Sequence, residues 1–161
     1  MLPRDVLLLL VTALVAVLPP VPLQRPYAET HLPRVMVRAV LREAHVYVFD
    51  KEPSEGRLRV AAAQVRLEGL ALPGKNLGGL ERIKGQPWVQ VDPVTQLRAF
   101  DTYAEAARAY WTLLAKVCRG ALASFDYAGP EEIAGRLYRC WWFRSPEDRY
   151  ARVLRALLRE P

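Results

Sequence analysis

The sequence predicts a mainly α-helical domain with a small β-hairpin lobe, an α+β class, and three observations predict it. Apolar residues recur at the three- and four-residue spacing of amphipathic helices in several segments. Capping boxes and prolines followed by acidic residues precede some of those segments. One pair of short extended runs, separated by turn residues, lies between the helical segments. With 161 residues, 52% of them hydrophobic, the chain has the size and composition of one folded domain.

The first half of the domain is expected to contain two helices. Residues 34–49 carry a wide apolar face, so we expect a helix there. A second helix is expected to follow the capping residue Ser54 and to run to about residue 68 or 69. Its inner face is made of small residues, mostly alanine, which lets neighbouring helices come close. The glycine-rich residues 70–85 are expected to be irregular.

The second half is expected to contain a hairpin and three helices. The two extended runs, 88–91 and 96–100, flank the turn sequence 92–95. The box Thr102-Tyr103-Ala104-Glu105 predicts a helix that ends near residue 118. Pro130, followed by two glutamates, predicts another helix start. Ser145-Pro146-Glu147-Asp148 predicts a second capping box and the last helix.

The N-terminal residues 1–33 combine an apolar stretch with a proline-rich linker. Residues 6–18 are apolar except for Thr12, but they fall short of the roughly 20 residues that span a bilayer. A signal peptide, a membrane anchor through residues 6–23 and a packed helix are all compatible with this stretch. Export or anchoring is favoured, because no charged residue interrupts the run. The folded domain is then expected over residues 34–161.

Composition excludes some classes of protein. A net charge of +6 favours anionic surfaces, whether nucleic acid or cell envelope, but the chain shows no helix-turn-helix spacing or RNA-binding aromatic motif. We therefore expect no nucleic-acid partner. Cys118 and Cys140 lack the spacing of a zinc site, His31 and His45 add no ligand cluster, and we expect no metal or cofactor. One disulfide between the two cysteines is possible.

Glu68 is the strongest catalytic candidate. It stands at the C-terminal end of an otherwise apolar helix, where the helix dipole and the apolar neighbours both disfavour a charged carboxylate. Its pKa should therefore be raised, as protonation of a glycosidic oxygen near neutral pH requires. Gln64, one turn earlier, lies on the same face. The alternative is a surface glutamate paired with Arg66 or Lys75.

Four blocks of the sequence resemble the glucosaminidase family of peptidoglycan hydrolases, in the lysozyme-like superfamily. Residues 55–69, EGRLRVAAAQVRLEG, are similar to the family's AQ-x-x-x-E helix. NLGGL (76–80) with IKG (83–85) resembles its N-[LF]-G-[GN]-I-K-G stretch. LRAFDTYAEAARAY (97–110) and WFRSPEDRY (142–150) resemble the remaining two blocks. The blocks occur in the family's order and cover about residues 32–158.

The resemblance implies a lysozyme-like, two-lobed domain with a groove between the lobes and Glu68 as general acid. It further implies peptidoglycan glycan strands as the substrate, cleaved at a β-1,4 bond by hydrolysis or lytic cleavage. The implied substrate-binding residues shape the groove floor or stack on sugar rings, and they are Gln64, Asn76, Gly78, Gly79, Trp88, Phe100, Tyr103, Tyr110, Trp142 and Tyr150.

The sequence departs from the family pattern in ways that leave alternatives open. Gly69 follows the acid where the family has serine or threonine, and Glu81-Arg82 interrupts the glycine-rich block. A binding or structural component of an envelope or phage assembly, with little or no catalysis, is the main alternative. Glu81, Asp92 and Asp101 are candidates for a second carboxylate, although Asp101 fits a cap residue and Asp92 a turn residue, and the substrate's N-acetyl group can assist instead; Glu68 alone is assigned a catalytic role. The protein is expected to act at the cell envelope, exported or membrane-anchored, and a phage origin is possible.

Overall fold

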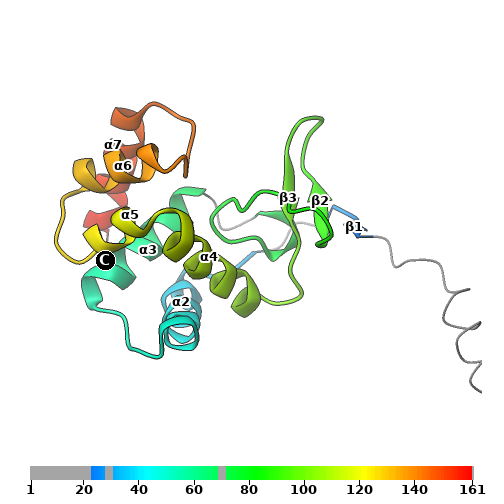
Figure 1. The fold of residues 1–161 in the computed structure, drawn as a ribbon, viewed down its shortest axis with the longest axis horizontal. Coiled ribbons are helices and arrows are strands. Elements are labelled where there is room, and N and C mark those ends of the chain that lie inside the picture. The colour runs from blue at the N-terminus through cyan, green and yellow to red at the C-terminus, as the bar shows by residue number, and fades with distance from the viewer. Residues whose placement is uncertain (1–22, 28–30, 69–71, 161) are drawn as a thin grey trace, which may run out of the picture.

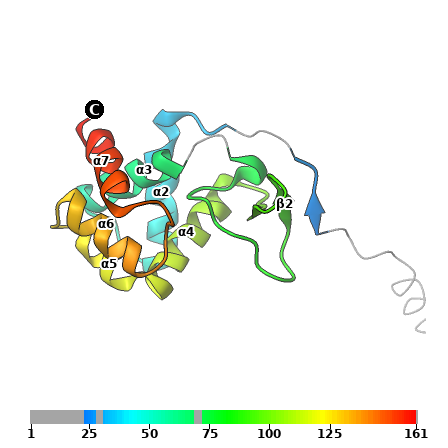
Figure 2. The ribbon, with the colours of Figure 1, turned by 90° about the horizontal axis from the view of Figure 1, so that it is seen from above.

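Six α-helices and one three-stranded sheet make up the residues that the computed structural model describes, which are 23–27, 31–68 and 72–160. The helices form one body and the sheet forms a smaller lobe beside it (Figures 1 and 2). This arrangement confirms the predicted mainly helical fold with a small β lobe. The helices are α2 (Arg34–Phe49), α3 (Glu55–Glu68), α4 (Tyr103–Val117), α5 (Arg119–Ser124), α6 (Pro130–Arg139) and α7 (Glu147–Arg159).

Helix α3 lies between α2 and α7 and is the most buried helix of the body (Figure 2). Residues 60–65 are all buried, and three of them are alanines, so the neighbouring helices pack closely on it. The predicted small-residue face is therefore confirmed. Trp111 of α4 fills the centre of the body, and its indole Nε1 donates a hydrogen bond to the Leu41 carbonyl at 2.9 Å.

Helix starts follow most of the predicted capping signals. The hydroxyl of Ser54 accepts a hydrogen bond from the Arg57 backbone N–H at 3.0 Å. Thr102 and Glu105 form the predicted capping box at α4. Pro130 occupies the first turn of α6 as expected. The capping box predicted at Ser145 is wrong, because extended Pro146 itself precedes α7 as its N-cap and no side chain caps that helix.

Helix α5 was not predicted. It begins at Arg119, directly after Cys118, which is both the C-cap of α4 and the N-cap of α5, and no side chain caps it. Cys118 is joined to Cys140 by a disulfide, which connects the end of α4 to the end of α6. The pairing that the sequence left open is thus present in the structure.

The sheet has the order β1-β2-β3, with β1 (Gln24–Arg25), β2 (Trp88–Gln90) and β3 (Gln96–Arg98). Strands β2 and β3 form the predicted antiparallel hairpin, with Val89 opposite Leu97. The short parallel strand β1 comes from the segment interpreted as a linker. A 3-10 turn, η1 (Pro73–Lys75), leads from the helical body into this lobe.

The apolar stretch at residues 6–18 lies outside the described residues. Within residues 23–27, 31–68 and 72–160, no helix has both the length and the hydropathy to cross a bilayer.

Candidate active site

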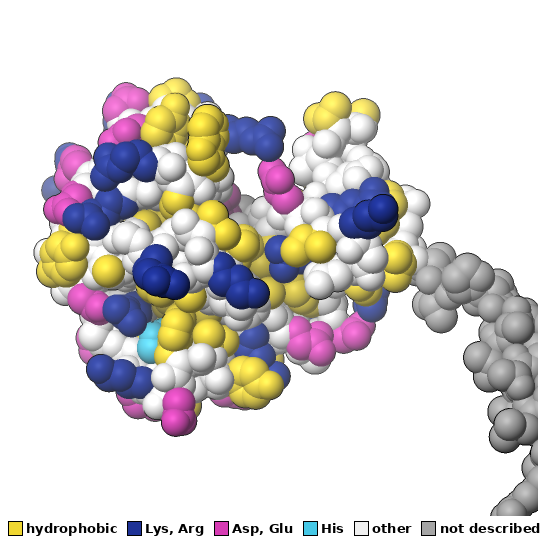
Figure 3. All heavy atoms as spheres, in the orientation of Figure 1, with side chains coloured by type: hydrophobic (Ala, Val, Ile, Leu, Met, Phe, Trp, Pro, Cys, Tyr) yellow, Lys and Arg dark blue, Asp and Glu magenta, His cyan; other side chains and the backbone are white. Residues whose placement is uncertain are grey.

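Glu68, the last residue of α3, lines a pocket of about 420 Å³ at the junction of the two lobes. The helical body contributes most of its wall, and the β lobe contributes Glu81 and Thr95. A second pocket of about 370 Å³ shares Glu81, Thr95 and Arg144 with the first, so the two form one groove. Figure 3 shows the surface hollowed between the lobes.

The Glu68 carboxyl is largely withdrawn from water. Desolvation by burial raises its pKa from 4.5 to about 7, against the smaller lowering effect of a hydrogen bond from Tyr150. No ion pair of Glu68 occurs among the described residues, and Arg66 pairs with Glu160 instead. The carboxyl therefore has the raised pKa that the sequence indicated, and the surface ion pair that was the alternative is not formed with Arg66.

Three polar side chains form a hydrogen-bonded group next to Glu68, and one of them, Tyr150, contacts its carboxyl. The Tyr150 hydroxyl donates a long hydrogen bond to Glu68 Oε1 at 3.4 Å. Burial and the nearby Glu68 charge raise the pKa of Tyr150, so this hydroxyl stays protonated and remains a donor. Gln64 is fully buried, and its Oε1 accepts a hydrogen bond from the Tyr110 hydroxyl at 2.7 Å. Tyr110 is itself fully buried, so it supports the site without reaching the groove surface.

The glycine-rich loop lies against the acid. Gly79 has a positive φ of 64°, and a Cβ built on it would lie 3.4 Å from Glu68 Oε2. Gly78 packs on the ring of Tyr110, where a Cβ would approach to 2.9 Å. Asn76 is buried, and its amide bonds to the Leu80 backbone and to the Arg98 carbonyl. Asn76 therefore holds the loop in shape, and its side chain does not line the groove.

Aromatic residues form the helical wall of the groove. Trp142 is half-buried and contacts Tyr110 edge-on, with the ring centroids 5.6 Å apart. Phe143 stacks on Tyr150 at a centroid distance of 3.7 Å. Trp141 also lines the pocket, is 84% exposed and has a left-handed backbone with φ of 61°. Such a backbone is costly for a residue other than glycine, and strain of this kind gathers at functional sites.

Three other predicted substrate-binding residues do not line the Glu68 pocket. Trp88 lies on β2 beneath the guanidinium of Arg82, which is 4.3 Å from its ring centroid. Phe100 and Tyr103 pack against the hydrophobic core at the start of α4. The structure thus brings Gln64, Gly79, Trp142 and Tyr150 together around Glu68 and places these three aromatic residues elsewhere.

Of the three candidate second carboxylates, Glu81 alone lines the pocket with Glu68. Asp92 accepts hydrogen bonds from the backbone of Val94 and Thr95 within the hairpin turn. Asp101 pairs with Arg25 at 2.6 Å. Glu81 is largely exposed, and it meets Arg144 of the helical body at 3.3 Å across the groove.

Trp141 and Arg144 line the groove but are not among the predicted substrate-binding residues. They follow α6 in the loop after Cys140, which the disulfide joins to Cys118, and their place in the groove depends on how this loop packs against the β lobe. Among the described residues, no group of three or more His, Cys, Asp or Glu side chains is placed to bind a metal.

Comparisons of this chain with protein-family models, with curated proteins and with solved structures find no match.

Proposed function

We propose that this protein is a peptidoglycan hydrolase of lysozyme-like architecture that cleaves the β-1,4 glycan backbone with Glu68 as general acid. One observation carries the proposal: a carboxyl with its pKa raised to about 7 lies in a groove between a helical body and a β lobe. A carboxylic acid that keeps its proton near neutral pH is what protonation of a glycosidic oxygen requires. The four blocks of family resemblance supply the substrate class.

In the proposed reaction, Glu68 gives its proton to the glycosidic oxygen while the bond from C1 to that oxygen breaks. The departing sugar leaves as a neutral alcohol. Water then adds at C1, and the proton that it releases restores the Glu68 carboxyl. Tyr150 keeps the carboxyl oriented through its hydroxyl, and Gly79 leaves room for a sugar ring next to the acid.

Two features of the groove suit a peptidoglycan strand. Trp141 and Trp142 offer aromatic faces of the kind on which sugar rings stack. Arg82 and Arg144 line the same groove and suit the carboxylates of muramic acid and of the stem peptides. Glu81 lines the same pocket from the β lobe and is our candidate for a second carboxylate, which would stabilise the positive charge that develops at C1; assistance by the substrate's N-acetyl group is the other route.

The disulfide supports action outside the cytoplasm, since disulfides form and persist mainly in oxidising compartments. Export or anchoring through the apolar N-terminal residues accords with this location, where the glycan substrate lies.

The test is a peptidoglycan-clearing assay with the full chain, beside Glu68→Gln and the control Glu43→Gln. Glu43 is exposed on α2 and makes no ion pair among the described residues, so its replacement removes one carboxylate away from the groove. We expect clearing by the wild type and the control, and a loss of about 100-fold or more in Glu68→Gln. Mass spectrometry of the fragments then identifies the bond.

Clearing by Glu68→Gln at the wild-type rate would refute Glu68 as the acid. If neither protein clears the wall but both bind it, the groove belongs to a binding component of an envelope or phage assembly. If folded wild-type protein neither clears nor binds peptidoglycan, the substrate class is wrong.

A further inference from the structure

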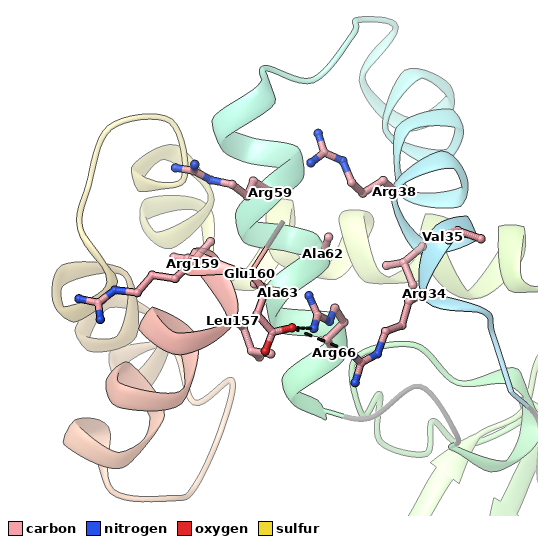
Figure 4. A pocket seen from close by; sticks show the side chains of 12 residues that line it. Arg34, Val35, Arg38, Arg59, Ala62, Ala63, Arg66, Leu157, Arg159 and Glu160 are labelled. Atoms are coloured by element: carbon pink, nitrogen blue, oxygen red, sulfur yellow. Dashed lines mark hydrogen bonds and ion pairs between the residues drawn. The ribbon is translucent and has the colours of Figure 1, made fainter.

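A pocket of about 690 Å³ lies away from the Glu68 groove, between α2, α3 and α7 (Figure 4). Its floor is apolar and includes Ala62, Ala63 and Leu157. Val35 stands at the edge with 85% of its surface exposed. The pocket thus offers both volume and apolar surface to a ligand.

Five arginines surround this apolar floor, and they are Arg34, Arg38, Arg59, Arg66 and Arg159. Figure 4 shows Arg66 beside the Glu160 carboxylate, with Arg34 approaching the same group at 3.9 Å. Glu160 is the one acidic residue among the described residues of the lining, and Arg38 pairs with Glu55 outside it, so the pocket carries an excess of positive charge.

Two of these arginines have no acidic partner in the part of the chain that the structure describes. Arg59 and Arg159 form no ion pair within the described residues. They also line a neighbouring pocket of about 400 Å³, so they stand where the two pockets join. Guanidinium groups without a carboxylate partner are suited to an incoming phosphate, which they can bind in a bidentate manner.

The pocket and the Glu68 groove are on opposite sides of α3. Successive residues of an α-helix are rotated by about 100° around the helix axis, so residues two positions apart point to nearly opposite sides. Arg66 and Ala62 each lie two positions from Gln64 and therefore face away from it. Gln64 and Glu68 share the groove side, one turn apart. A ligand in the arginine-lined pocket therefore does not compete with one in the groove.

We propose that the arginine-lined pocket binds an anionic phospholipid, with the phosphate at Arg59 and Arg159 and acyl chain on the apolar floor. A bare anion would leave the exposed Val35 and the half-buried Leu157 and Leu158 in water, whereas an amphiphile covers them. Arg34 and Val35 begin α2, the helix that follows the apolar stretch and its linker. Basic pockets between helices recognise lipid headgroups by the same chemistry.

The test measures binding of water-soluble dihexanoyl phosphatidylglycerol to the full chain by calorimetry. Dihexanoyl phosphatidylcholine serves as the neutral-headgroup control, glycerol phosphate as the headgroup without chains, and hexaglutamate as an acidic peptide. We expect phosphatidylglycerol to bind about 10-fold or more tightly than each of the three, a difference of about 1.4 kcal/mol or more.

Three variants test whether the lipid binds in the arginine-lined pocket. Arg59→Gln with Arg159→Gln should weaken phosphatidylglycerol binding about 10-fold, because two phosphate contacts are lost. Arg119→Gln with Arg149→Gln removes the same charge from exposed positions outside the pockets and should leave the affinity within about 2-fold. Ala62→Leu fills the floor, keeps every arginine and should also weaken lipid binding. Thermal melting confirms that each variant folds.

Equal affinity for glycerol phosphate and phosphatidylglycerol would overturn the lipid assignment in favour of a simple anion site. Tighter binding of hexaglutamate would assign the pocket to an acidic peptide. Equal losses in the two arginine double variants would mean that charge alone attracts the lipid and that the pocket is not the site. None of these outcomes depends on activity in the groove, so the proposed hydrolase function is tested separately.

Discussion

Replacing Glu68 by glutamine should make the stability of the protein less dependent on pH. Glu68 is the acid whose pKa burial raises from 4.5 to about 7. Between these two values, the folded protein keeps the proton while the unfolded chain has lost it. The folded state therefore binds more protons, and its stability falls as the pH rises through this interval. Glutamine is a neutral side chain of the same shape and removes the effect.

The size of the effect follows from the two pKa values. Each pH unit of difference corresponds to about 1.4 kcal/mol, so a rise from 4.5 to about 7 corresponds to about 3 kcal/mol. This contribution to stability is fully present below pH 4.5 and is lost above pH 7. The wild type should thus lose about 3 kcal/mol relative to Glu68→Gln between pH 4 and pH 8.

Urea unfolding of the wild type and of Glu68→Gln at pH 4, 6 and 8 measures this difference directly. Taking the difference between the two proteins cancels the titration of all other groups. A difference that stays constant from pH 4 to pH 8 would show that the Glu68 carboxyl is hydrated and has an ordinary pKa. That result would remove the observation on which the proposed function rests.

Three further perturbations have defined outcomes. Replacing Cys118 and Cys140 by alanine should lower the free energy of unfolding by about 3 kcal/mol, measured by urea unfolding, because the disulfide closes a 22-residue loop. Trp141→Ala should raise KM for glycan fragments about 3-fold to 10-fold without lowering Tm, since the ring is exposed; an unchanged KM would exclude stacking. Tyr150→Phe removes a hydrogen bond that lowers the Glu68 pKa, so the alkaline limit of activity should move to higher pH; a shift to lower pH would contradict this.

Local signals predicted the helices well because the residues that decide a helix end lie within one turn of it. Thr102 and Glu105 make their capping box from side chains three positions apart. Ser145 shows the limit of such reasoning, because its motif fits a capping box but extended Pro146 takes the capping position. Strand β1 could not be predicted, since two residues become a strand only by pairing with β2, more than 60 positions away.

The sequence predicted Glu68, the acid of the candidate site, but not the contact between Glu81 and Arg144 at the edge of the groove. Glu68 could be predicted because it is a carboxylate at the end of an otherwise apolar helix, and this is visible from the sequence of that one segment. Arg144 and Glu81 meet across 63 positions of sequence, so their contact depends on how the two lobes pack. Tyr110 is buried because its side of α4 faces the core. The sequence alone does not decide which side that is, because several neighbours of Tyr110 are also apolar.

The pairing of β1 with β2 also determines how the molecule would respond to mechanical load. The first described residues contact the β lobe before the chain reaches the helical body. The Trp88 N–H donates a hydrogen bond to the Leu23 carbonyl, and Arg25 forms an ion pair with Asp101. The helical body begins only at Arg34. Tension applied through the N-terminus would therefore pull on the β wall of the groove before it reached the wall that carries Glu68. A tethered molecule would have a groove whose width responds to force.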